Sequence, residues 1–297
     1  MVVQIIHNNI VPNIAQIINP DTIQNRYDLS EKDYYVFLFQ YEGKEYALTG
    51  ALNGQRLNIG LWLVPLPNAI LKQIFSDIFL QLRVVKQIRY QHSYSELGEQ
   101  VQKGNHFKIV LPQTIKELQL RLSSKHRYNL RREKNIIENE IGRVEFIEFN
   151  LNIPDEIVNR FFEFKYNTHR FDYNLTARQY LDAYHVTDAY VLRAGDKILS
   201  IVFSCEQCAY TYIENLTYDS FYSKYSPGQV LYNYYLERLV EKGRKVLFLS
   251  GGELAYKRRY GSIEEVTYEG IVFKNKYWHF RYRLRLFLSA VKNKFRK

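Results

Sequence analysis

The order of the expected elements in the last third of the chain is the feature that most limits its fold. Three apolar runs separated by turn residues predict antiparallel strands, and two helix–strand pairs follow them. These elements are expected over residues 189–194, 198–205, 209–218, 229–242, 245–249, 253–260 and 266–273. The order predicts an α+β fold in which helices flank a mixed sheet.

The earlier segments predict the same class of fold and a second domain. Ser123 or Ser124 is expected to cap a helix that runs to about Glu140 and ends at Gly142. Other helices are expected over 68–82, 114–121, 154–168 and 176–184, and other strands over 34–40, 45–48, 57–64, 84–90, 107–111 and 143–149. No Ser/Gly-rich linker is visible. The softest boundary runs from Lys103-Gly104-Asn105 to Pro112, which gives domains 1–110 and 111–297.

A loop that ends in glycine precedes the helix expected over 229–242. It reads Tyr222-Ser-Lys-Tyr-Ser-Pro-Gly228-Gln-Val-Leu231. Backbone N–H groups and the positive end of the helix dipole make such a helix start a binding site for anions, and Gly228 allows a phosphate to approach the backbone. Pro-Gly before a helix is also a common turn, so the motif alone leaves both interpretations open.

Several short segments, taken in order, resemble the GNAT superfamily of acyltransferases. They are Ser123–Arg132, Tyr225–Gly228 with Leu231, Gly243 before the strand Val246–Leu249, and Gly252–Gly261. The likeness is greatest to the cellulose-biosynthesis/capsule-locus (CelD/BcsL-like) branch, which is related to the Fem-type transferases. It implies the GNAT fold, with tandem GNAT-like lobes: a degenerate lobe over 1–110, and an acyltransferase domain over 111–297 that carries the basic C-terminal helix. The sequence departs from the family's Gln/Arg-x-x-Gly-x-Gly/Ala loop at Tyr225 and Val230.

The resemblance implies an acyl-CoA-dependent N-acyltransferase in which an amine attacks acetyl-CoA directly. Residues that contact the cofactor are expected at Leu216, Tyr218, Lys224, Ser226, Gly228, Gln229 and Val230. Glu214 is the expected base and Tyr256 the expected acid for the leaving thiolate, while Lys257 matches a substrate-binding position. Their ordinary alternatives are a salt-bridged carboxylate, a packed ring and a solvated cation.

Two histidines and a basic cluster are further candidates. His169 follows a helix and is either a second candidate base or a structural histidine. His126, Arg127 and Arg131 belong to a basic run over 121–134, which either is a solvated helix face or binds the phosphates of the acceptor. With the branch resemblance, this cluster indicates a nucleotide-linked amino sugar used in surface polysaccharide (O-antigen or capsule) biosynthesis as the acceptor.

Other features limit cofactors and location. Cys205-Glu-Gln-Cys208 lacks a second pair of ligands, so no metal is expected. The N-terminus has no basic segment before a long apolar run, and no apolar stretch is long enough to cross a bilayer. A cytoplasmic protein is therefore expected.

The net charge of +10 and the tail over 281–297 leave alternatives open. The tail predicts a basic amphipathic helix, which either makes weak peripheral contact with an anionic membrane or packs on the protein. One rival to the acetyltransferase is a Fem-like transferase that uses aminoacyl-tRNA. Another is a non-enzymatic protein that binds anionic surfaces. No nucleic-acid-binding motif is recognised, and the oligomeric state is left open.

Overall fold

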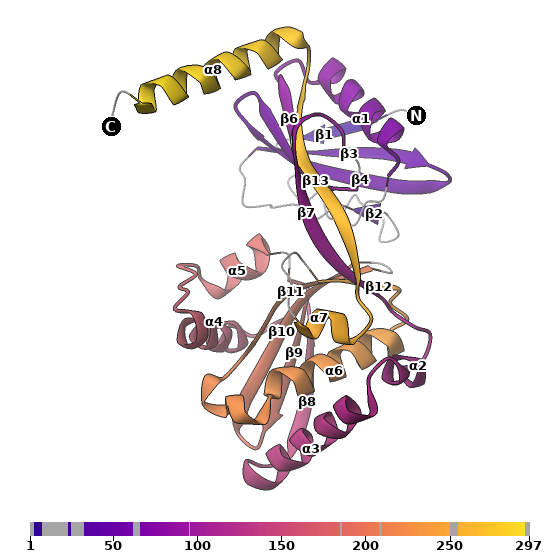
Figure 1. Ribbon diagram of the computed structural model, residues 1–297, viewed down its shortest axis with the longest axis vertical. Coiled ribbons are helices and arrows are strands. Elements are labelled where there is room, and N and C mark those ends of the chain that lie inside the picture. Colours follow the sequence, from indigo (N-terminus) through magenta and orange to yellow (C-terminus); the bar gives the residue numbers. More distant parts are fainter. Residues whose placement is uncertain are drawn as a thin grey trace. The chain divides into compact units, whose positions relative to one another are not determined.

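The computed structural model describes residues 3–7, 23–24, 33–61, 66–94, 96–184, 186–207, 210–249 and 255–294 (Figure 1). The chain forms two compact units. Unit 1 consists of residues 1–104 and 266–297, and unit 2 consists of residues 105–265. None of the described helices is long and apolar enough to span a membrane.

Unit 2 is built on a mixed sheet in the order β7-β12-β11-β10-β9-β8. The strands are β7 (Glu99–Val110), β8 (Val144–Asn150), β9 (Asp188–Ala194), β10 (Lys197–Gln207), β11 (Tyr210–Tyr218) and β12 (Val246–Phe248). Strands β8 to β11 form an antiparallel meander, β12 pairs in parallel with β11, and β7 pairs antiparallel with β12. The parallel pair requires a crossover, which is supplied by helix α6 (Pro227–Glu241).

Helices cover both faces of this sheet (Figure 1). Tyr190 and Leu192 of β9 lie in a core with α6 and the helices α2 (Ile115–Leu120) and α3 (Ser124–Glu140). Ala189 and Val191, the alternate residues of β9, lie in a second core with α4 (Asp155–His169) and α5 (Ala177–Ala183). Successive side chains of a strand point to opposite faces, so the sheet separates two apolar cores.

Local signals set the ends of these helices. Ser123 Oγ accepts a hydrogen bond from His126 N at 3.2 Å, and Thr176 forms a capping box with Gln179. The helix α3 ends before Gly142, whose φ of 147° favours glycine. The predicted helix over 123–140 is therefore confirmed, including its cap.

Unit 1 has the same topology as unit 2. Its meander is β1 (Gln4–His7), β3 (Tyr34–Tyr41), β4 (Lys44–Asn53) and β5 (Arg56–Gly60), with β2 (Ile23–Gln24) beside β4. Helix α1 (Asn68–Gln81) leads to β6 (Gln87–Ser93), which is parallel to β5, and β13 (Ile263–Phe273) is antiparallel to β6. The repeated order of meander, helix, parallel strand and antiparallel strand confirms the predicted tandem lobes with mixed sheets flanked by helices.

The division between the units differs from the sequence-based boundary at residue 110. It falls inside strands β7 and β13, so the last strand of unit 1 comes from the C-terminal end of the chain. The basic helix α8 (Lys276–Lys294) therefore belongs to unit 1, although the sequence assigned it to the second domain. Gly104-Asn105 resembles a turn in sequence but continues β7, where the Gly104 carbonyl accepts a hydrogen bond from Thr267 Oγ1 at 3.4 Å.

Candidate active site

Strands β11 and β12 separate partway along their length. Their pairs run from Tyr210–Val246 to Tyr212–Phe248, and β11 continues to Tyr218 whereas β12 ends. In the described part of the chain, the second half of β11 therefore has a sheet partner only on its β10 side. The polar backbone of the other edge faces the gap and needs partners of another kind.

A β-bulge places Glu214 at the start of this gap. Phe203 of β10 pairs with Asn215 and Ser204 pairs with Ile213, so Glu214 is the extra residue between them. Such a bulge changes the direction of a side chain that regular alternation would fix, and bulges are frequent beside active sites. Glu214 is half-buried and lines the largest described cavity of unit 2.

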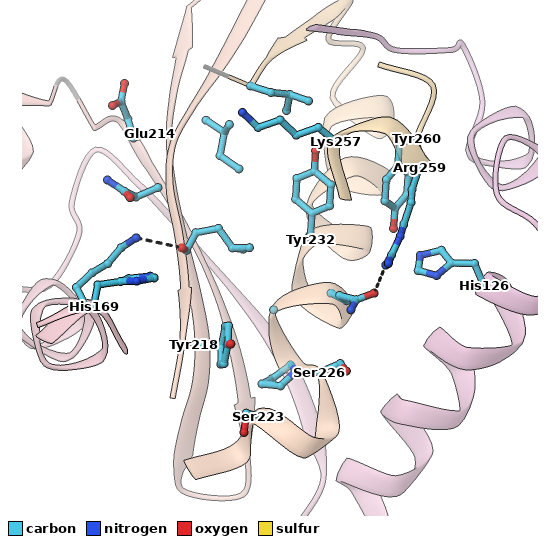
Figure 2. A pocket seen from close by; sticks show the side chains of 18 residues that line it. His126, His169, Glu214, Tyr218, Ser223, Ser226, Tyr232, Lys257, Arg259 and Tyr260 are labelled. Atoms are coloured by element: carbon cyan, nitrogen blue, oxygen red, sulfur yellow. Dashed lines mark hydrogen bonds between the residues drawn. The ribbon is translucent and has the colours of Figure 1, made fainter. Parts of the chain in front are cut away.

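This cavity has a volume of about 640 Å³ and lies entirely within unit 2 (Figure 2). In Figure 2, Glu214 and His169 lie on one side of β11, whereas Lys257, Tyr232 and Arg259 lie on the other. The structure brings together nine of the residues singled out in the sequence, namely His126, His169, Glu214, Leu216, Tyr218, Ser226, Gly228, Gln229 and Lys257.

Three other candidates lie away from the cavity. Lys224 is directed toward Glu140, 3.9 Å away, and its ammonium lies over the Tyr225 ring. Val230 is buried in the core because it lies on the inner face of α6. Arg127 donates to the carbonyls of Gln119 and Leu122, which fastens the turn between α2 and α3.

The last two predicted residues are Arg131 and Tyr256. Arg131 lines a different cavity of about 440 Å³, one turn of α3 beyond Arg127. Tyr256 belongs to helix α7 (Ala255–Arg259), but its side chain lies outside the described residues, so its predicted role as the acid stays a prediction.

The start of α6 borders the cavity. Ser226 adopts the left-handed conformation (φ 51°, ψ 43°), Pro227 occupies the first helical position, and Gly228 follows. The 3₁₀ helix Ser220–Tyr225 leads into this turn. The helix begins two residues before the predicted Gln229, which puts Gly228 in the first turn. The Gln229 N–H donates to the Ser226 carbonyl at 2.9 Å, whereas a regular helix leaves its earliest N–H groups without an acceptor in the preceding turn. The helix start can therefore receive an anion.

Basic side chains predominate in the lining of the cavity. His126, Lys165, His169, Lys257 and Arg259 line it, whereas Glu214 is its one carboxylate among the described residues. Burial lowers the pKa of Lys165 and of Lys257, and burial and the Arg259 guanidinium both lower the pKa of His126. The Lys165, Lys257 and Arg259 cations attract a phosphorylated ligand.

Two of these cations were not found in the sequence. Lys165 precedes His169 by one turn of α4 and donates to the Leu216 carbonyl of β11 at 3.4 Å. Its spacing from His169 was a usable signal, because residues four apart share a helix face. Arg259 donates to Gln229 Oε1 at 2.7 Å and so links α7 to the start of α6. No comparable spacing rule indicates Arg259.

Among the described residues, no group of three His, Cys, Asp or Glu side chains is arranged to hold a metal ion. Cys205 is a buried residue of β10, and Cys208 lies outside the described residues.

The separated strands, the bulge and the helix start at one cationic cavity define a class of protein, the GNAT-type acyltransferases. Residues 124–258 match the family model described as the acetyltransferase (GNAT) domain. This part of the chain is a GNAT acetyltransferase domain, and the protein is an acyltransferase enzyme. The domain implies an acyl-CoA as the acyl donor.

Solved structures share the fold over most of the chain. The structure of L-PGS from Bacillus licheniformis is 15% identical, with a TM-score of 0.54 over 81% of this chain and 85% of that chain. The crystal structure of FemX is 9% identical, with a TM-score of 0.57 over 82% of this chain and 89% of that chain. No curated protein matches the sequence. At these identities the likeness establishes the fold and not the substrate.

Proposed function

We propose that the protein transfers the acetyl group of acetyl-CoA to the amino group of a nucleotide-linked amino sugar, in the cellulose-biosynthesis/capsule-locus (CelD/BcsL-like) branch of the superfamily. The observation that carries the proposal is the single cavity that joins the gap beside β11, the Glu214 bulge and the start of α6. Surface polysaccharide assembly, including O-antigen, lipopolysaccharide and capsule, is the corresponding role.

The donor is assigned to the gap and the helix start. An extended amide-containing arm can pair with the free edge of β11, as an added strand would. The pyrophosphate then lies at the first turn of α6, where Ser226, Gly228 and Gln229 contact it and the dipole favours negative charge. Leu216 and Tyr218 line the cavity between the gap beside β11 and the start of α6.

The transfer itself needs a base, a polarising donor and an acid. Glu214 takes a proton from the acceptor ammonium, and an N–H group on the free edge of β11 polarises the thioester carbonyl. Lys257 is buried, and its ammonium stabilises the thiolate that leaves. Tyr256 remains the proposed proton donor to this thiolate. His169 is the alternative base on the Glu214 side of β11.

Charge supports an anionic acceptor. His126 and Arg259 also line a second depression of about 410 Å³ with Arg121, Lys125 and Asn129. A diphosphate is a suitable ligand there, because one guanidinium group can donate two parallel hydrogen bonds to the oxygens of a phosphate. Lys165 adds positive charge to the same cavity as Glu214, where the amino group of the sugar is expected.

The test is release of free CoA thiol from acetyl-CoA with a panel of UDP- and dTDP-linked amino sugars. The matched controls are the same nucleotides linked to sugars that carry a hydroxyl in place of the amine. Thiol release with one amino sugar and none with its hydroxyl counterpart is expected. Thiol release that is equal with both members of every pair contradicts the proposal.

A Fem-like transfer from aminoacyl-tRNA is the second candidate, because the fold of FemX covers 82% of this chain. It requires an aminoacyl-tRNA donor in place of acetyl-CoA. Activity that appears only with charged tRNA and is destroyed by ribonuclease selects this candidate. Activity with acetyl-CoA alone that survives ribonuclease rejects it.

A further inference from the structure

Helix α8 presents a continuous apolar stripe to solvent. At 3.6 residues per turn, Tyr277, Phe280, Leu284, Phe287 and Leu288 fall on one face of the helix. Their exposed fractions range from 44% for Leu284 to 64% for Phe280 and Phe287. Exposed apolar residues usually occur singly, so five that adjoin on one helix face indicate a binding surface.

The opposite face contacts unit 1 in the first half of α8, whereas residues 283–289 are exposed on every side. The rings of His279 and Tyr282 pack on Phe273 at centroid distances of 5.1 and 5.3 Å. Lys86 Nζ lies 5.6 Å from the Trp278 ring, and His279 Nε2 contacts the Glu99 carboxylate. Because these contacts use the face away from Leu284, the apolar stripe is directed outward from unit 1.

Basic residues flank the stripe on both sides. Arg281, Arg285 and Lys292 lie on one flank and Lys276 and Arg283 on the other, by the same helical geometry. The sequence from residue 276 to 297 contains no Asp or Glu. An apolar stripe between two cationic rows is the pattern of a helix that lies in the surface of an anionic bilayer.

A cavity of about 540 Å³ lies in unit 1 beside the Arg281 flank. Its cationic lining consists of Arg56, Lys86, Arg281 and Arg285, with no carboxylate among its lining residues. The Nε of Arg56 is buried and has no hydrogen-bond partner. A buried donor without a partner costs free energy unless a ligand satisfies it, and a phosphate oxygen has the right chemistry.

We propose that α8 anchors the protein to an anionic lipid bilayer. The stripe enters the boundary between headgroups and acyl chains, and Arg56, Lys86, Arg281 and Arg285 bind headgroup phosphates. The positive charge of α8 favours an anionic bilayer as the partner, because one anionic surface can contact the basic residues on both flanks at once. The proposal is independent of the acceptor and of the transfer chemistry in unit 2.

The test is co-sedimentation of the full chain with phosphatidylcholine vesicles, with and without phosphatidylglycerol. Binding is expected only with phosphatidylglycerol and is expected to weaken as salt is raised. The paired substitution Arg281→Gln/Arg285→Gln should reduce binding by roughly fivefold for each arginine. The pair Phe280→Gln/Phe287→Gln should reduce it by about tenfold or more, because the apolar area that enters the bilayer is lost.

Matched controls come from exposed sites elsewhere. Leu80→Gln in α1 removes a leucine that is 72% exposed, and Arg178→Gln in α5 removes an exposed arginine. Both should bind vesicles as the natural protein does, and all variants should keep their melting temperature and acetyl-CoA binding.

Failure of the natural protein to bind phosphatidylglycerol vesicles overturns the proposal, as does binding that none of the α8 variants weakens. Dimerisation lost in the Phe280/Phe287 pair, without vesicle binding, would assign the stripe to a second copy.

Discussion

Gly228 at the start of α6 lies directly against Tyr218 at the end of β11. A β-carbon at position 228 would be 3.2 Å from Cδ1 of Tyr218 and 3.7 Å from Cδ2 of Leu216. The first distance is tighter than ordinary van der Waals contact, so any larger residue displaces the Tyr218 ring. Both Tyr218 and Gly228 line the cavity, and the close approach therefore fixes its shape where the pyrophosphate is expected.

Substitution of Gly228 should weaken acetyl-CoA binding. We expect Gly228→Ala to raise the dissociation constant by roughly tenfold, about 1.4 kcal/mol, and Gly228→Val to raise it further. Isothermal titration calorimetry measures the change. The control is Gly104→Ala in β7, where the added β-carbon would be 3.5 Å from Thr267 Oγ1 in ordinary contact. If Gly228→Val bound acetyl-CoA as tightly as the natural protein, the donor would not bind at the start of α6.

The carboxylate of Glu214 should affect the transfer and not donor binding. Glu214→Gln keeps the shape of the side chain but cannot take the proton, so kcat should fall by about 10²- to 10⁴-fold. The dissociation constant of acetyl-CoA should stay the same. Glu145→Gln in β8, a carboxylate paired with Arg193 at the surface, should leave kcat unchanged. An unchanged kcat in Glu214→Gln would transfer the role of base to His169.

Loss of the Lys257 ammonium should lower activity without lowering the stability of the fold. Its ammonium is buried and burial lowers its pKa, so the charge is costly to the folded state. Because the folded pKa lies below the unfolded value, the cost is present at neutral pH and is relieved as pH rises through that folded pKa. Lys257→Met should therefore keep or raise the free energy of unfolding at neutral pH, while kcat falls by about tenfold or more.

Urea unfolding and thiol release measure the two effects. Arg258→Met, which removes a neighbouring exposed cation, is the control and should change neither by a comparable amount. The Lys257 ammonium also lies 5.4 Å from the Phe107 ring, so the expectation is that burial outweighs such contacts. A Lys257→Met variant that loses stability at neutral pH would contradict a net cost of burying the ammonium.

Asp188 should make stability depend on pH. Burial and the Glu206 carboxylate raise the pKa of Asp188 from 3.8 to about 6. The folded state therefore binds a proton that the unfolded state releases, and stability falls as pH rises from about 4 through about 6. The loss is on the order of 2 to 3 kcal/mol from the size of the pKa shift.

Urea unfolding across this pH window tests the assignment to Asp188. Asp188→Asn should remove the fall in stability, while Asp196→Asn at an exposed turn should retain it. A fall that persists unchanged in Asp188→Asn would contradict the assignment to Asp188.

Local signals in the sequence were enough to predict much of unit 2. The cap at Ser123 and the glycine at position 142 identify α3, because these signals act within one turn. The Pro-Gly loop likewise identified the start of α6 and its place at the cavity. The family resemblance supplied Glu214 and Lys257, which composition and periodicity alone do not distinguish.

Non-local pairing set the features that the sequence did not reveal. The bulge at Glu214 depends on the register of β10, and nothing in Ile213-Glu214-Asn215 signals an extra residue. The assignment of β13 and α8 to unit 1 depends on pairing with β6, far away in the chain. Lys165 joins the cavity only because α4 packs against β11. Lys224 and Arg127 fit the charge pattern but are held by local partners.

The central claim is that the cavity beside β11 binds acyl-CoA, and thermal unfolding with and without acetyl-CoA tests it most directly. At 100 times its dissociation constant, a bound ligand adds roughly 2.7 kcal/mol of stability, which raises the melting temperature by a few degrees. We expect this shift for the natural protein and a smaller one, at the same acetyl-CoA concentration, for Gly228→Val. No shift for the natural protein at saturating acetyl-CoA would rule out donor binding in this cavity.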